Sequence, residues 1–175
     1  LNQMKKYDIY IDGSHLDKQH NGRLGIGGVI VDLSGPGMGR IIDEFSQELS
    51  PEYMNLMFGA EKCSNPSAEL AALLIALGKF KKSFGPNDIL VVHADYIGVK
   101  SWMEGTWKIK EPYIARIKND IDDEIKKQGL RGRISYEWVK GHQSKSSTEP
   151  DAYWNSYVDK VGKGEKWADL VVIGE

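Results

Sequence analysis

Four acidic side chains stand near the ends of predicted strands and helices, and together they could perform phosphate chemistry. They are Asp12, Glu69, Asp95 and Asp159. Two carboxylates about 4 Å apart repel by about 4 kcal/mol at an effective dielectric of 20, so a fold that gathers four of them needs divalent cations. Mg²⁺ prefers hard oxygen ligands and keeps coordination positions open for phosphate and water. The pattern predicts a metal site that acts on phosphate groups.

Each acidic residue also has an ordinary structural explanation. Asp12 precedes Gly13 at the end of a predicted strand, where an Asp-Gly turn is common. Glu69 lies near the start of a helix, where the helix dipole favours a negative charge. Asp95 could cap a short helix, and Asp159 could be a solvated charge. Each explanation is stronger than function when taken alone, but four such residues in order at comparable positions favour a shared site.

The elements that must position these residues follow from hydrophobic periodicity. Three strands joined by short turns predict an antiparallel meander, over 7–11, 24–33 and 40–49. A loop at 50–65 then leads to an amphipathic helix over 66–84, with Asn65 as the expected N-cap. The later elements are strands at 88–94 and 133–139 and helices at 98–103, 112–128 and 151–161. This order predicts an α/β (mixed α+β) fold with a five-stranded mixed sheet, three strands antiparallel and two parallel, flanked by helices.

The second predicted strand contains three glycines, which are costly inside a strand. Gly25, Gly27 and Gly28 therefore indicate a bulge or the close approach of a neighbouring element. A phosphate-cradling loop is disfavoured, because no Gly-Lys-Ser/Thr follows and the next element is a strand.

Length and composition predict one domain in a reducing compartment. The 175 residues, 41% of them hydrophobic, suit a single domain over 1–175, with a core at about 5–164 and a tail at 165–175. The net charge of −2 gives no general attraction to nucleic acid, so a local basic patch would have to hold it. Cys63 is the only cysteine, and no signal-peptide or membrane-spanning stretch is evident. We expect a soluble cytoplasmic protein with no membrane association.

Five short motifs, in order, resemble type 1 ribonuclease H. The resemblance spans about 7–164, and any one motif alone would be weak evidence. The matching stretches are Ile-Asp-Gly-Ser at 11–14, Ser-Asn-Pro-Ser-Ala-Glu-Leu at 64–70, Ala-Asp-Tyr at 94–96, Trp-Val-Lys-Gly-His at 138–142 and Asn-Ser-Tyr-Val-Asp at 155–159. The stretch 98–110 is similar to the compact branch of the family, which lacks a long basic protrusion. The implied fold is the ribonuclease H-like fold.

The resemblance implies an activity and a set of catalytic residues. The activity is endonucleolytic hydrolysis of the RNA strand of RNA/DNA hybrids, leaving 5′-phosphate and 3′-hydroxyl ends. The four acidic residues become ligands of two Mg²⁺ ions, with Mn²⁺ as a substitute. His142 matches a loop histidine that assists proton handling or product departure, although an ordinary exposed histidine is the alternative. His15, His20 and His93 are interpreted structurally, and His93 is expected to be packed and hydrogen-bonded in the core.

Substrate contacts are also implied by the resemblance. Near the RNA strand, whose 2′-hydroxyl distinguishes RNA from DNA, the matching residues are Gly13, Ser14 and Asn65. The family often has glutamine where this chain has Pro66, so one minor-groove contact is in doubt.

On the DNA strand, Ser64 matches a residue of the family's phosphate pocket. Trp102 and Trp107 resemble aromatics of the DNA channel, although tryptophans at this spacing are more often core residues. Positive charge for phosphate contact comes from Lys108 and Lys110, together with Lys100, and a solvated surface is the alternative for all three.

Two other functions remain open at this stage. One is a nuclease of the same fold that acts on DNA in the manner of a recombinase, and the other is a catalytically silent hybrid-binding domain. The motif neighbours disfavour the first, and the complete set of carboxylates with His142 disfavours the second. The expected partner is an RNA/DNA hybrid, without an organic cofactor, and the protein is expected to be a monomer.

Overall fold

A five-stranded mixed sheet lies at the centre of the computed structural model, which describes residues 3–17, 22–141 and 149–165. Its strands are β1 (Lys6–His15), β2 (Leu24–Asp32), β3 (Arg40–Leu49), β4 (Ile89–Ala94) and β5 (Ile134–Trp138). Their order is β3-β2-β1-β4-β5. β1, β2 and β3 pair antiparallel, whereas β4 pairs parallel with β1 and β5. The predicted mixed sheet is confirmed.

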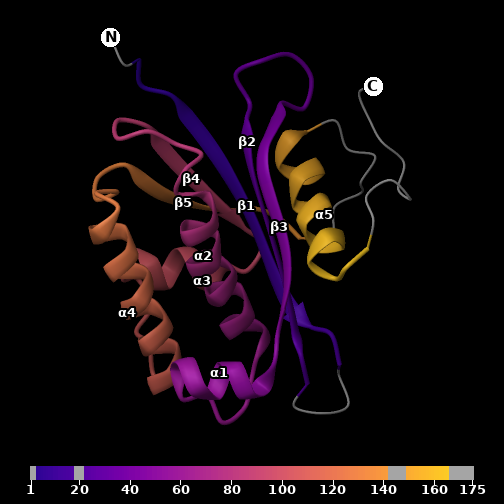
Figure 1. Ribbon diagram of the computed structural model, residues 1–175, viewed down its shortest axis with the longest axis vertical. Helices are drawn as coiled ribbons and strands as arrows, with labels where there is room; N and C mark the ends of the chain where they lie inside the picture. Colours follow the sequence, from indigo (N-terminus) through magenta and orange to yellow (C-terminus); the bar gives the residue numbers. More distant parts are fainter. Residues whose placement is uncertain (1–2, 18–21, 142–148, 166–175) are drawn as a thin grey trace.

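Helices cover both faces of the sheet (Figure 1). They are α1 (Pro51–Phe58), α2 (Asn65–Phe80), α3 (Ile97–Met103), α4 (Pro112–Lys127) and α5 (Pro150–Gly162). α2 and α4 pack on one face over Ile9 and Ile11, while α5 packs on the other face over Tyr10. This division follows from the alternation of side chains along β1. Among the described residues, no helix combines the length and apolar character needed to span a bilayer.

The glycines of β2 allow α5 to approach the sheet closely. A Cβ atom on Gly25 would stand 2.4 Å from the carbonyl oxygen of Gly162, and one on Gly27 would stand 2.9 Å from the same residue's backbone. On the other face, a Cβ on Gly28 would meet the ring of Phe45 at 2.4 Å. The predicted close approach is therefore confirmed.

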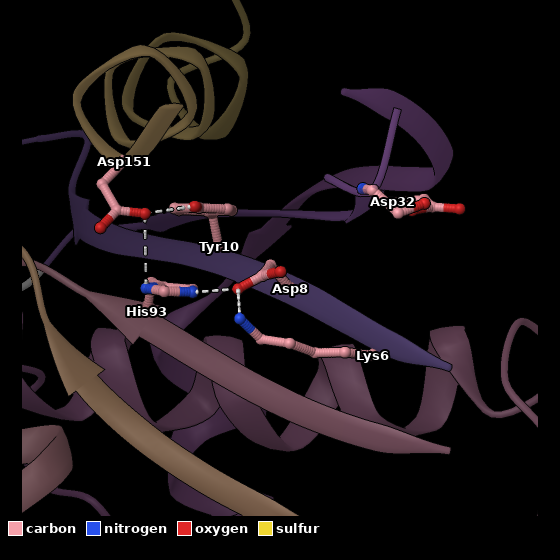
Figure 2. Close-up of polar contacts among 7 residues, drawn as sticks. Lys6, Asp8, Tyr10, Asp32, His93 and Asp151 are labelled. Atoms are coloured by element: carbon pink, nitrogen blue, oxygen red, sulfur yellow. Dashed lines mark hydrogen bonds and ion pairs between the residues drawn. The ribbon is translucent and has the colours of Figure 1, made fainter. Parts of the chain in front are cut away.

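A polar cluster fastens the start of α5 to the middle of the sheet (Figure 2). The Tyr10 hydroxyl donates to Asp151 Oδ1 at 2.5 Å, and its ring stacks on His93 with centroids 4.3 Å apart. His93 Nε2 lies 2.7 Å from Asp8 Oδ1. These contacts confirm His93 as a packed, hydrogen-bonded core residue. They also fix the helix that carries Asp159 about two turns further along.

The prediction of a loop over 50–65 was wrong, because this stretch contains α1. Ser50 caps the helix by accepting a hydrogen bond from the Tyr53 N–H at 3.0 Å, and Pro51 is its first residue. Gly59 ends the helix in the left-handed conformation, with a φ of 71°. Serine, proline and glycine at these positions are helix start and stop signals.

The boundaries predicted for the following helix also need correction. Ser64, not Asn65, is the N-cap: its Oγ accepts from the Ser67 N–H at 3.2 Å, and Ser67 Oγ accepts from the Ser64 N–H at 3.0 Å. α2 then ends at Phe80, four residues earlier than predicted. The Ser83 N–H donates a hydrogen bond to the Phe80 carbonyl oxygen at 2.8 Å, which forms a turn after the helix.

Candidate active site

Asp12 lies inside β1 and is buried. The strand was predicted to end at Ile11, but it continues to His15, and Asp12 is paired with Gly27 of β2. An Asp-Gly turn is therefore excluded at this position. The strand continues because its backbone stays paired with β2 beyond Asp12, at Gly13 and as far as His15. This pairing outweighs the tendency of the Asp-Gly pair to form a turn.

Glu69 reaches the same place from the second turn of α2. It is 5% exposed, and its carboxylate accepts a hydrogen bond from the Gly13 N–H. The approach is close because Gly13 lacks a side chain: a Cβ there would lie 2.4 Å from the Ala68 carbonyl oxygen. Glu69 Oε2 is buried without a hydrogen-bond partner among the described residues. An unpartnered buried oxygen of this kind is a cost that a cation would remove.

Asp95 completes a compact group of three carboxylates. It follows β4, the parallel neighbour of β1, and one oxygen from each of Asp12, Glu69 and Asp95 lies within 4.8 Å of the others. The Asp95 backbone is held by Trp138, whose indole N–H donates to its carbonyl oxygen at 3.0 Å. Gly141 passes close by, and a Cβ there would lie 3.2 Å from Asp95 Oδ2.

Crowding and burial oppose negative charge on this group in the absence of a metal. Burial, followed by the charges of Asp95 and Asp159, raises the pKa of Asp12 to about 8. Burial and the charges of Asp12 and Asp95 raise the pKa of Glu69 well above its usual value. Neighbouring oxygens around one Mg²⁺ stand roughly 3 to 4 Å apart, since each bond is about 2.1 Å long. One oxygen from each of the three side chains lies within 4.8 Å of the others, slightly wider than this spacing, so the group can hold a hard divalent cation if the side chains close in on it.

Asp159 lies at the edge of this group. It lines the same cavity, which has a volume of about 780 Å³, but its oxygens fall outside the compact set of three. Its Oδ1 lies 3.0 Å from Lys163 Nζ on the next turn of α5. The role of Asp159 as a metal ligand stays a prediction. Lys163 also lines the cavity and was missed, although its spacing of four residues from Asp159 on a helix was a usable signal.

Of the three histidines other than His93, the structure describes one. His142 and His20 lie outside the described residues, so the proton-handling role of His142 stays a prediction. His15 lines the cavity, and its Nε2 lies 3.0 Å from the Cys63 carbonyl oxygen, in keeping with a structural role.

The residues predicted to contact the RNA strand surround the carboxylates. Gly13, Ser14 and Asn65 line the same cavity, together with Pro66. Asn65 Oδ1 accepts from the His15 backbone N–H at 3.0 Å, which ties the start of α2 to the end of β1. The cavity therefore has the residues needed to receive a polar strand, and their contact with RNA stays a prediction.

The residues predicted to contact the DNA strand line a second cavity of about 450 Å³. Trp102, Trp107, Lys108 and Lys110 all belong to its wall. Trp107 is 42% exposed and meets Trp102 edge-on, with ring centroids 6.2 Å apart. Trp102 also packs against the hydrophobic core, so the core role that its spacing indicated is confirmed. Its contact with the DNA strand stays a prediction.

Two further residues predicted for substrate contact are engaged within the protein. Ser64 Oγ caps α2 and lies 3.0 Å from the Tyr113 hydroxyl. Lys100 Nζ lies 2.7 Å from Glu104 Oε1 and donates to the Tyr136 carbonyl oxygen at 2.9 Å. Lys108 and Lys110 are therefore the cations that remain exposed beside the tryptophans.

Comparison with known proteins gives one family. The sequence model described as RNase H matches residues 4–165. LC11-RNase H1, isolated from compost by a metagenomic approach and solved in complex with an RNA/DNA hybrid, has a TM-score of 0.67 and 20% identity over 94% of this chain and 99% of its own.

Two other solved structures have the same fold. RNase H1 from the halophilic archaeon Halobacterium salinarum has a TM-score of 0.62 and 18% identity, over 89% of this chain and 93% of its own. An N-terminal RNase H domain from Mycobacterium tuberculosis has a TM-score of 0.63 and 22% identity, over 90% of each chain. A comparison with curated proteins found no match. Because the family model matches residues 4–165 of the 175 in the chain, the chain belongs to the RNase H family and is a ribonuclease H hydrolase.

Proposed function

We propose that the protein cuts the RNA strand of RNA/DNA hybrids endonucleolytically, using Mg²⁺, with Mn²⁺ as a substitute. The observation that carries the proposal is the meeting of the Asp12, Glu69 and Asp95 oxygens within 4.8 Å, in an open cavity. The structure of LC11-RNase H1 with an RNA/DNA hybrid supports the choice of substrate, because its fold is similar. The compact-branch assignment and a single domain over 1–175 form part of the same proposal.

Each residue of the site has a role that its position supports. Two bound cations would activate a water for in-line attack and stabilise the departing 3′ oxygen, giving 5′-phosphate and 3′-hydroxyl ends. Asp12, Glu69 and Asp95 would hold them, and the Gly13 N–H orients the Glu69 carboxylate. Asp159 would complete the ligand set from α5.

Residues around the carboxylates would handle the two strands. Ser14 and Asn65 lie on the cavity wall where a 2′-hydroxyl could be recognised. His142 would assist proton transfer or product departure. Trp107 and Lys108 would contact the DNA strand in the neighbouring cavity. We propose a monomer without an organic cofactor, acting in the reducing environment of the cytoplasm.

A cleavage assay tests this function. A labelled hybrid, the same sequence as duplex DNA and the same sequence as duplex RNA would each be incubated with and without Mg²⁺. We expect cutting confined to the RNA of the hybrid and dependent on Mg²⁺. Cutting of duplex DNA would support the recombinase-like alternative, and binding without cutting under every condition would leave a silent hybrid-binding domain.

Mg²⁺ should raise the melting temperature of the protein without substrate. A ligand that binds only the folded state at 100 times its Kd adds about 2.7 kcal/mol of stability, or roughly 5 to 10 °C for a chain of this size. Differential scanning fluorimetry with increasing Mg²⁺ measures the shift. Asp43→Asn, which removes an exposed carboxylate on β3, should keep it. A shift of equal size in Asp12→Asn would argue against the proposed metal site.

A further inference from the structure

A strongly basic surface is formed by two chain segments that contain no acidic residue. The segments are 79–87 and 125–133. We call this surface the basic end; its cations are Lys79, Lys81, Lys82, Lys126, Lys127, Arg131 and Arg133. These seven are drawn from only 23 lysines and arginines in a chain whose net charge is −2. Positive charge is therefore concentrated here.

The fold brings the two segments together where α2 and α4 end (Figure 1). Gln128 Nε2 donates to the Leu77 carbonyl oxygen at 2.9 Å, joining the two helix ends. The Arg133 guanidinium donates to the carbonyl oxygens of Asp88 at 2.6 Å and Gly129 at 2.9 Å. These contacts hold the segments in one arrangement, so part of the entropy cost of ordering a binding surface is already met.

The charges of the basic end are not neutralised within the described part of the chain. None of the seven cations forms an ion pair there with a carboxylate. Two acidic residues flank the segments. Asp88 is buried and accepts hydrogen bonds from the backbone N–H groups of Gly85 and Lys5, and Glu124 accepts from Gln128.

Helix dipoles explain only part of this concentration. Lysines are favourable in the last turn of a helix, which accounts for Lys79, Lys126 and Lys127. Lys82 and Arg131 lie beyond the helix ends and are exposed. Stability of α2 and α4 gives no reason for these two charges, so an anionic partner is the better explanation.

The surface is also hollowed. A cavity of about 350 Å³ lies between the segments, lined by Lys81, Lys82, Arg133 and Gln128. Gln128 and Arg133 already donate to oxygens of the protein, so Lys81 and Lys82 supply the exposed donors at this cavity. Within the described chain, no exposed large apolar side chain comes from either segment. Membrane surfaces usually require such apolar side chains, so the chemistry fits phosphate in water rather than a lipid surface.

We propose that the basic end binds the phosphate backbone of nucleic acid outside the catalytic cavity. It precedes β4, whereas Asp95 follows β4, so about 20 Å of strand separates the two surfaces. A ribonuclease H meets long polyanions, and cations at this distance can hold a portion that the carboxylates do not touch. The binding step does not depend on cleavage, so it is measured without metal.

The test compares two double variants with the same change of charge. Lys82→Gln/Arg131→Gln alters the basic end, and Arg23→Gln/Arg40→Gln alters exposed arginines at the β2–β3 edge. The probe is a fluorescent RNA/DNA hybrid of about 30 base pairs in EDTA, followed by anisotropy over a series of salt concentrations. The basic-end variant should bind about 3- to 10-fold more weakly at low salt, with a slope of log Kd against log salt smaller by about 2. The control should keep the wild-type slope.

Several outcomes overturn the proposal. These are unchanged binding by the basic-end variant, an equal loss in both variants, or wild-type binding to poly-glutamate as tight as to the hybrid. A second assay separates this proposal from the proposed function: cleavage of a short hybrid, at a saturating concentration of the hybrid and with Mg²⁺ present. There the basic-end variant should match the wild type. Wild-type binding without any cutting would contradict the proposed function and leave the basic end supported.

Discussion

Asp12→Asn should abolish hybrid cleavage and, in metal-free solution, stabilise the fold. The substitution removes a ligand oxygen and a carboxyl group that is costly to ionise, because its pKa is raised to about 8 among oxygens that lie within 4.8 Å. A loss of about 4 kcal/mol of transition-state stabilisation corresponds to roughly a 1,000-fold lower rate. The relief of repulsion and of charge burial should raise the melting temperature in EDTA by a few degrees, because 1 kcal/mol is worth about 2 to 4 °C. Single-turnover cleavage and thermal melting measure the two effects.

The pH dependence of melting identifies the cause. The pKa of Asp12 is raised to about 8, so between about pH 4 and pH 8 the folded protein binds a proton that the unfolded chain releases. The stability gained from that proton is complete below pH 4 and is lost as the pH rises through 8. The melting temperature of the metal-free wild type should therefore fall over this range. Asp12→Asn should flatten the fall, whereas Asp43→Asn should retain it. Parallel curves for wild type and Asp12→Asn would contradict the assigned repulsion.

Local pattern in the sequence was sufficient to predict the sheet and the three carboxylates that the fold brings together. An alternating β-rich stretch, an apolar run and turn signals predicted the three antiparallel strands, and the motifs around Asp12, Glu69 and Asp95 identified three residues that the fold brings together. The extent of β1 was not predictable, because Asp12-Gly13 has the composition of a turn. Pairing with β2 determines where β1 ends. That pairing depends on residues distant in the chain, which a local sequence pattern does not include.

One of the missed features, α1, is local, and the others depend on packing between distant segments. The eight residues of α1 give too short an apolar pattern to predict a helix from periodicity, although its serine, proline and glycine signals are present. The spacing of Lys163 from Asp159 was a local signal, but its place on the wall of the cavity follows from the packing of α5 against the sheet. The basic end forms from two segments that are separated in the chain by residues 88–124, and the joined ends of α2 and α4 make them one surface.

Gly13→Ala should damage both stability and catalysis, because this glycine sets the distance between the strand and the helix that carry two of the carboxylates. An added Cβ would lie 2.4 Å from the carbonyl oxygen of Ala68 and 2.5 Å from its carbonyl carbon. Both are backbone atoms, so α2 itself must move away from β1. Overpacking of this kind costs about 3 kcal/mol, or roughly 10 °C in melting temperature. A displacement of about 1 Å at Glu69 should also lower cleavage by about 100-fold.

Gly78→Ala is the matched control, because it adds the same methyl group to α2, the helix that a Cβ on Gly13 would meet. A Cβ on Gly78 meets nothing within 4 Å, and alanine is the better helix former by about 1 kcal/mol. This variant should melt at the wild-type temperature or slightly above it and cleave at the wild-type rate. If Gly13→Ala matched it in both measurements, α2 would have to move away from β1 without cost. The contact between Gly13 and Ala68 could then not be what sets the separation of Asp12 and Glu69.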